Sequence, residues 1–261
     1  MTTHALTDSA TMLRRNLRHM LRYPSMTVLL VGMPVVFLLL FVYVFGGTLG
    51  DGLGGASGGR AEYVNYVAPA IILMTVTAVI QGTSISVAMD LTEGIIARFR
   101  TMAIARVSVL TGHVLGSMIQ AAFALTIVIG VALLVGFRPS ASVGEWFAVA
   151  GVLAAVTFAL VWFSVALGQV SKSVETASNL PMPLIFLPFL GSGFVPTESM
   201  PDGLRWFAEY QPFTPIIETL RGLLMGTPIG NHALFALGWC LVIAVGGYAW
   251  SKKLFNREYS R

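Results

Sequence analysis

Six long stretches without a charged residue constrain this chain more than any other feature of its sequence. They are residues 23–50, 63–89, 107–137, 146–171, 176–197 and 222–251, and they contain 28, 27, 31, 26, 22 and 30 residues. About 20 apolar residues in a helix, at about 1.5 Å rise each, cross the hydrocarbon core of a bilayer. The sequence therefore predicts an all-α polytopic membrane protein with six transmembrane helices.

The composition agrees with this fold class. Hydrophobic residues make up 56% and charged residues 11% of the chain, and the mean hydropathy is +0.78. A soluble domain could not bury that much apolar surface. The net charge is +4, but the cations are not gathered on one soluble face, so no nucleic-acid partner is expected. Cys240 is the one cysteine, which excludes an intramolecular disulfide and a cysteine metal site.

The positive charges predict the orientation. With the N-terminus in the cytoplasm, that side holds 12 of the 16 Lys and Arg residues, and the outside keeps Arg60, Arg138, Arg205 and Arg221. Short cytoplasmic loops of membrane proteins carry an excess of positive charge. We therefore expect a multi-pass protein of the cytoplasmic membrane with both termini in the cytoplasm. The first 22 residues contain no apolar core of signal-peptide length, so no cleaved signal is expected.

Two charged segments on the cytoplasmic side have the periodicity of amphipathic helices. In residues 6–22, leucine and alanine side chains form one stripe opposite four arginines, which predicts either an interfacial helix or a basic arm that only sets topology. In residues 90–106, Asp90, Thr92 and Glu93 suit a helix start, and arginines crowd the later part. This second helix would either rest on lipid headgroups or dock to a partner protein.

The outer regions differ in apolar character. Residues 46–60 contain Gly50, Gly52 and Gly55 in a G-x-G-x-x-G arrangement, but no strand precedes them, so we expect a flexible loop and not a dinucleotide site. Residues 194–226 are divided by prolines and are too apolar for a free loop. They predict two short helices that dip back into the membrane, after a fifth span that Pro181, Pro183 and Pro188 should kink or break.

Two of these regions carry a resemblance to a known family. The pattern D-x-x-x-G-x-x-x-R-F-R at residues 90–100 is similar to the first cytoplasmic loop of type 2 ABC-exporter permeases, above all the daunorubicin-resistance type of multidrug efflux permease. Residues 211–222, Q-P-F-T-P-x-x-E-x-x-R-G, resemble the extracellular re-entrant hairpin of that family. Ala103 and His113 stand where the family pattern has Pro and Arg.

The resemblance implies an organisation for the chain and for its partners. Residues 1–261 would form a single ABC-2 type transmembrane domain, with a connecting helix at 6–22, a coupling helix at 90–103 and re-entrant helices at 197–226. Two copies of a separate ABC ATP-binding subunit, which carry the ATP and Mg, would assemble with this permease and a second permease chain, identical or related. The residues that would couple to the ATPase are Asp90, Glu93, Gly94, Arg98, Phe99, Arg100 and Arg106.

The implied function is ATP-driven export of a lipophilic compound, such as a drug, an antibiotic or a lipid-like molecule. Export of a polysaccharide or lipid-linked glycan is the alternative, and a scaffold without transport is a third. An intramembrane enzyme would need clustered acid, His or Ser groups inside spans, and the sequence offers only scattered ones. No metal-binding, phosphate-binding or nucleophile motif occurs, so we expect no catalytic residue, metal or cofactor in this chain.

Two polar sets inside or near the spans are candidate pathway residues. Thr77, Gln81 and Ser84 share one helix face, which could line a substrate route or supply hydrogen bonds between helices. Glu218 and Arg221 lie three residues apart at membrane depth, where lone charges are costly. They predict an ion pair that either closes the outer mouth of the pathway or is purely structural.

Overall fold

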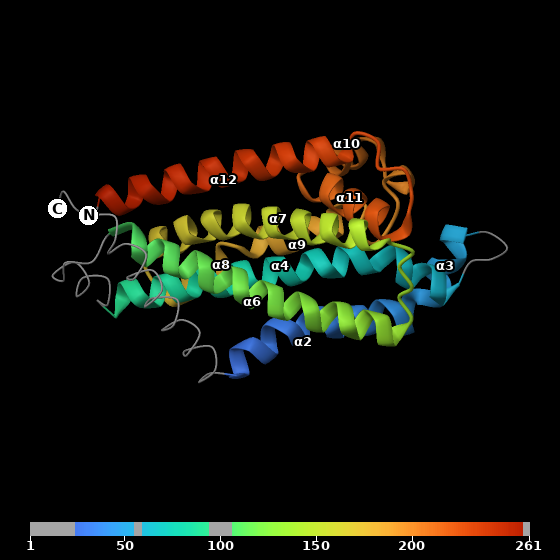
Figure 1. Ribbon diagram of the computed structural model, residues 1–261, viewed down its shortest axis with the longest axis horizontal. Coiled ribbons are helices and arrows are strands. Elements are labelled where there is room, and N and C mark those ends of the chain that lie inside the picture. The colour runs from blue at the N-terminus through green and yellow to red at the C-terminus, as the bar shows by residue number, and fades with distance from the viewer. Residues whose placement is uncertain (1–23, 55–58, 94–105, 258–261) are drawn as a thin grey trace.

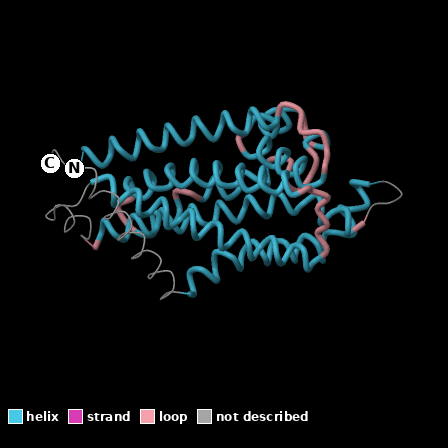
Figure 2. The backbone as a smooth tube through the Cα atoms, in the orientation of Figure 1, coloured by secondary structure: helices cyan, strands magenta, loops and turns pink. Residues whose placement is uncertain are grey.

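The computed structural model of the protein describes residues 24–54, 59–93 and 106–257, which form an elongated bundle of helices (Figure 1). Every regular element in these ranges is a helix (Figure 2). The predicted all-α class is therefore confirmed for the described part of the chain. The elements are α2 (Pro24–Leu40), the π-helix η1 (Phe41–Phe45), α3 (Gly46–Gly54), α4 (Arg60–Thr92), α6 (Arg106–Val135), α7 (Val143–Val170), α8 (Val174–Asn179), α9 (Met182–Phe186), the 3-10 helices η3 (Leu187–Leu190) and η4 (Thr197–Ser199), α10 (Asp202–Tyr210), α11 (Phe213–Met225) and α12 (His232–Arg257).

The long helices run side by side, so the bundle has two distinct ends (Figure 1). At one end α4 and α7 finish and α6 begins, and we call it the Thr92 end. At the other end α6 finishes and α10 and α11 lie, and we call it the Gly136 end. Helix α12 returns from the Gly136 end to the Thr92 end.

Five helical segments of the described residues are long and apolar enough to cross a membrane. They are Leu30–Gly52, Arg60–Thr92, Leu110–Val135, Val143–Val170 and His232–Phe255. Each corresponds to one of the predicted charge-free stretches, and together with the family described below they indicate a multi-pass membrane protein.

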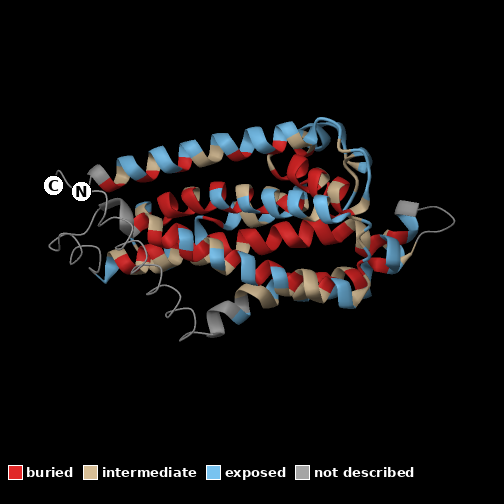
Figure 3. Cartoon of the chain, in the orientation of Figure 1, coloured by how far each residue is buried: buried red, intermediate tan, exposed pale blue. Residues whose placement is uncertain are grey.

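Helix α4 forms the centre of the bundle, and most exposed residues lie on the helices around it (Figure 3). From Tyr63 to Ala88 most side chains of α4 are buried. The surrounding helices expose large apolar side chains, among them Leu134, Phe147 and Leu234, which are 87%, 76% and 73% accessible. Such a surface suits hydrocarbon and not water.

The fifth predicted stretch, residues 176–197, is not one helix in the structure. It is divided into α8, α9 and η3, and the expected break at its prolines is confirmed, because Pro181 precedes α9 and Pro188 lies in η3. Near its start Gln81 Nε2 donates to the Ser178 carbonyl at 2.9 Å, and near its end the Tyr66 hydroxyl donates to the Ser192 carbonyl at 2.9 Å. Because Tyr66 and Gln81 are about 22 Å apart along α4, the broken segment runs beside α4 in the opposite direction.

The prediction of a loop at 46–60 is wrong for residues 46–54, where α3 continues the helix that begins at Pro24. Its glycines permit a close approach of the chain to itself. A Cβ atom added at Gly50 would lie 2.2 Å from the Gly59 carbonyl oxygen, at the start of α4. The apolar helix therefore extends into the glycine-rich sequence, and Gly50 lets it pack there.

The predicted helix start at Asp90, Thr92 and Glu93 is also wrong. Asp90 and Thr92 lie in the last turns of α4, and Glu93 is the residue at its C-terminal end. The Thr92 hydroxyl donates back to the carbonyl groups of Ala88 and Met89, at 3.0 and 3.1 Å. The central helix thus continues beyond the charge-free stretch because Asp90 has a buried partner, described below.

Helices α4 and α7 approach closely at Gly168. A Cβ atom at this position would lie 2.7 Å from the Ser84 carbonyl oxygen and 2.8 Å from the Val87 Cβ atom. Backbone contacts of this kind between small residues are a main source of helix association in membranes.

We expect Gly168→Ala to lower the free energy of unfolding by about 1–3 kcal/mol, because the methyl group must push α4 and α7 apart. Gly151→Ala in the same helix is the matched control, since a Cβ atom there meets nothing within 4 Å. The control should be neutral or slightly stabilising. Thermal unfolding of the two purified variants in detergent measures the difference, and equal midpoints would contradict the close contact.

Candidate functional site

Helix α11 carries the charged residues of the candidate site at the Gly136 end. Pro215 lies in its first turn, where a missing N–H costs no helical hydrogen bond, and Gly226 ends the helix with φ of 69°. Ile217, Leu220 and Leu224 are fully buried. This burial holds α11 against the bundle and presents Glu218 and Arg221 on consecutive turns.

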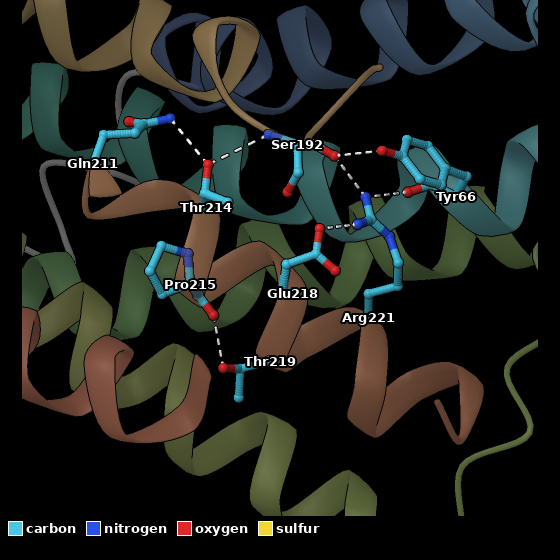
Figure 4. A network of polar contacts seen from close by, with 8 residues as sticks. All are labelled: Tyr66, Ser192, Gln211, Thr214, Pro215, Glu218, Thr219 and Arg221. Carbon is cyan, nitrogen blue, oxygen red and sulfur yellow. Dashed lines mark hydrogen bonds and ion pairs between the residues drawn. The ribbon is translucent and has the colours of Figure 1, made fainter. Parts of the chain in front are cut away.

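Arg221 is buried and joins three parts of the chain (Figure 4). Its Nη1 atom pairs with Glu218, as predicted. Its Nη2 atom donates to the carbonyl groups of Ser192, at 2.8 Å, and Tyr66, at 3.2 Å. The guanidinium carbon also lies 3.9 Å from the centroid of the Tyr66 ring, which is a cation–π contact. The predicted ion pair is therefore present, and its arginine also ties α11 to α4 and to the broken segment.

Other side chains of this region bond to the backbone that the broken segment leaves free. Gln211 Nε2 donates to the Leu187 carbonyl at 2.9 Å, and the Tyr63 hydroxyl contacts the Phe194 carbonyl at 3.4 Å. The Thr214 hydroxyl oxygen accepts a hydrogen bond from the Ser192 backbone N–H at 3.3 Å. Irregular backbone at membrane depth needs such partners. The network therefore replaces the hydrogen bonds that a continuous helix would make.

A cavity of about 1070 Å³ opens beside this network, between α10, α11 and α12. Its polar lining includes Glu198, Glu209, Glu218, Arg221 and His232. Its apolar lining includes Tyr210, Leu234, Phe235, Trp239 and Val242. The Ser192 hydroxyl is buried without a hydrogen-bond partner among the described residues and lies on the side of Glu218, which also lines the cavity (Figure 4). A large, mostly apolar cavity with a few convergent polar groups is typical of sites that bind small organic molecules.

Of the residues predicted to couple to an ATPase, those that the structure describes lie at the Thr92 end, opposite the cavity. Glu93 ends α4, and Arg106 begins α6. Gly94, Arg98, Phe99 and Arg100 lie outside the described residues, as does the helix predicted at 6–22. Asp90 is buried, and its Oδ2 atom lies 3.1 Å from His113 Nε2 inside the bundle.

The predicted pathway residues on α4 lie inside the helix bundle. Thr77 and Ser84 are buried, and the Thr77 hydroxyl donates to the Met74 carbonyl of its own helix at 2.8 Å. Gln81 donates a hydrogen bond to the Ser178 carbonyl of the broken segment. This contact is the hydrogen bond between helices that was the alternative to a pathway role. None of the three residues lines the cavity at the Gly136 end.

Sequence reasoning missed Tyr66 and Ser192, which both contribute to the network. Ser192 acts through its carbonyl group and Tyr66 through its ring and carbonyl as well as its hydroxyl, so neither has a distinctive side-chain spacing. The glycines that flank Ser192 were the available signal. A Cβ atom at Gly191 would lie 2.3 Å from Gln211 Nε2, and one at Gly193 would lie 2.6 Å from the Pro188 carbonyl oxygen.

Comparison with known proteins agrees with the resemblance in the sequence. A family described as ABC-2 type transporter matches residues 8–225. The daunorubicin resistance ABC transporter permease protein DrrB1 of Streptomyces coeruleorubidus is 28% identical over 259 residues, which cover 98% of this chain and 87% of that protein. The probable doxorubicin resistance ABC transporter permease protein DrrC of Mycobacterium tuberculosis is 28% identical over 187 residues, which cover 66% of this chain and 65% of that protein.

We expect Arg221→Lys to lower the free energy of unfolding by about 2–3 kcal/mol, because a single ammonium group cannot span Glu218 and two carbonyl groups at once. Arg205→Lys is the matched control. Arg205 lies on α10 with its side chain 44% accessible and pairs only with Glu209 among the described residues, at 2.7 Å. The control should cost under about 0.5 kcal/mol. Unfolding midpoints in detergent test this, and a loss as large for Arg205→Lys would remove the special role of Arg221.

Proposed function

The chain belongs to the ABC-2 type transporter family, and we propose that it is the membrane permease subunit of an exporter whose ATP-hydrolysing subunit is a separate protein. One observation carries the proposal: the family match covers 8–225, most of the helical bundle, in a chain whose sequence has no phosphate-binding motif. Energy for transport therefore comes from another polypeptide, which holds the ATP and Mg. Two copies of it act on a pore formed by this chain and a second permease, identical or related.

The exported compound is lipophilic, such as a drug, an antibiotic or a lipid-like molecule. The names of the two relatives concern resistance to daunorubicin and doxorubicin. The cavity at the Gly136 end supports the same class of compound, since aromatic and aliphatic side chains of α12 line it beside three glutamates. Compounds leave through this cavity, and Glu218 with Arg221 forms its gate.

The broken segment is the fifth of the six crossings. It runs beside the central helix from Ser178 to Ser192 in the direction opposite to α4, as a membrane crossing must if it starts at the Thr92 end. Six crossings place both termini on the cytoplasmic side together with the Thr92 end. Helices α10 and α11 then dip from the outside into the membrane at the Gly136 end.

The part of the predicted coupling helix 90–103 that follows α4 docks on the ATPase, with Phe99 as an apolar anchor in a groove of that subunit. Closure of two ATPases around ATP pulls on this segment and on the helix at 6–22. That pull tilts α4 and α6, which enter and leave the segment, and switches access to the cavity from the inside to the outside.

The topology makes a direct prediction for a tag inserted at residue 55, between α3 and α4. The tag should be labelled by an impermeant reagent from outside intact cells, because the Gly136 end faces outward. A tag after Arg261 should be labelled only after permeabilisation. Labelling of both tags in intact cells, or of the C-terminal tag alone, would overturn the orientation.

We expect Phe99→Ala and Arg98→Ala to leave membrane insertion intact but to reduce export on the order of tenfold or more, because both remove contacts with the ATPase. Phe147→Ala is the matched control, since this phenylalanine is 76% accessible on the outer face of α7. The assay co-expresses candidate ATP-binding proteins, identifies the one that copurifies, and measures its hydrolysis and drug accumulation in cells. Normal export by Phe99→Ala would contradict the coupling role.

A further inference from the structure

Asp90 and His113 form a buried acid–imidazole pair at the Thr92 end. Asp90 lies in the last turn of α4, and His113 lies two turns into α6. Their Oδ2 and Nε2 atoms are 3.1 Å apart, and the side chains are 9% and 5% accessible. An unpaired carboxylate or imidazole at such a depth would be costly, so the two helices cannot slide past each other here without breaking the pair at a price in stability.

The position of the pair relates it to the segment that the ATPase is proposed to grip. Helix α4 leads into residues 94–105 and α6 leads out of them, and we call the end of α4 and the start of α6 the two arms. Asp90 and His113 therefore join the two arms close to the points where residues 94–105 begin and end. A second link lies deeper in the bundle, where the Thr83 hydroxyl donates to Ser117 Oγ at 2.7 Å. The arms are thus connected by polar contacts at two levels.

The surroundings of the pair connect the arms to the rest of the bundle. Val87 of α4 belongs to an apolar cluster with Leu110 and Val114 of α6, Val165 of α7 and Phe255 of α12. Four helices therefore meet within about one turn of Asp90 along α4. A force that reaches α4 and α6 together at this level also reaches α7 and α12.

We infer that Asp90 and His113 are positioning residues that clamp α4 and α6 into a single lever, so that movement of the segment between them is transmitted to the whole bundle. The inference rests on the proposed function for the origin of the movement, but the clamp itself is a property of this chain. Without it the segment could move by bending the end of one arm, and ATP would be hydrolysed without moving the other helices.

The clamp is tested first on the purified chain, without any transport. Spin labels at Glu93 and Leu115, placed on a Cys240→Ser background, report the distance between the two arms. We expect His113→Leu to broaden this distance distribution and His113→Gln to preserve it, because the glutamine amide still donates to Asp90. An unchanged distribution in His113→Leu would overturn the clamp, whatever the chain transports.

The second arm of the test uses the complex with its ATP-binding subunit. His113→Leu should retain ATPase copurification and basal hydrolysis but lose on the order of tenfold in compound exported per ATP hydrolysed. His113→Gln and the exchanged pair Asp90→His/His113→Asp should recover most of that ratio. The positioning role would be overturned if the loss of export in His113→Leu only followed the amount of inserted protein. It would also be overturned if the exchanged pair exported no more compound per ATP than His113→Leu. Absence of export by the unchanged chain would instead contradict the proposed function, and the distance measurement would still decide the clamp.

Discussion

Residues 176–197 do not form one continuous helix. The backbone groups that this leaves without helical hydrogen bonds determine much of the structure around them. A carbonyl group without a partner costs several kcal/mol in hydrocarbon, so a crossing broken by prolines persists only against donors from elsewhere in the protein. Here the donors are side chains of Tyr66, Gln211 and Arg221, which bond to carbonyl groups of the broken segment. This requirement explains why α11, a helix with two charged residues, is packed into the bundle and not left on its surface.

The same requirement restricts what Arg221 can do. Its guanidinium contacts a carboxylate, two carbonyl groups and an aromatic ring, and an arginine serves this set of partners better than any other residue because its donors are fixed in a plane. Glu218 is the more accessible member of the pair and lines the cavity. A gate at this position would therefore move its glutamate first, while the arginine holds the backbone behind it.

Much of the fold could be predicted because hydropathy and proline act locally. Charge-free stretches located five long helices, and Pro181 and Pro188 located the break in the remaining stretch, residues 176–197. The end of α4 was predicted wrongly because a carboxylate such as Asp90 also suits a helix start, and its buried partner is 23 residues away in the sequence. In the candidate site the Glu218–Arg221 pair followed from spacing, but the contacts to Tyr66 and Ser192 depend on tertiary packing that no spacing encodes.

Helix α4 connects the two polar sites of the molecule. Tyr66 contacts Arg221 at the Gly136 end, and Asp90 contacts His113 at the Thr92 end. The two residues are 24 positions apart on one continuous helix, about 36 Å along its axis. A buried helix of this length transmits a displacement as a rigid body, except near Pro69, where one helical hydrogen bond is missing about one turn from Tyr66. Movement applied at the Thr92 end would therefore arrive at the cavity through α4, and the compliant turn at Pro69 would let the Tyr66 end adjust while Arg221 keeps its contacts.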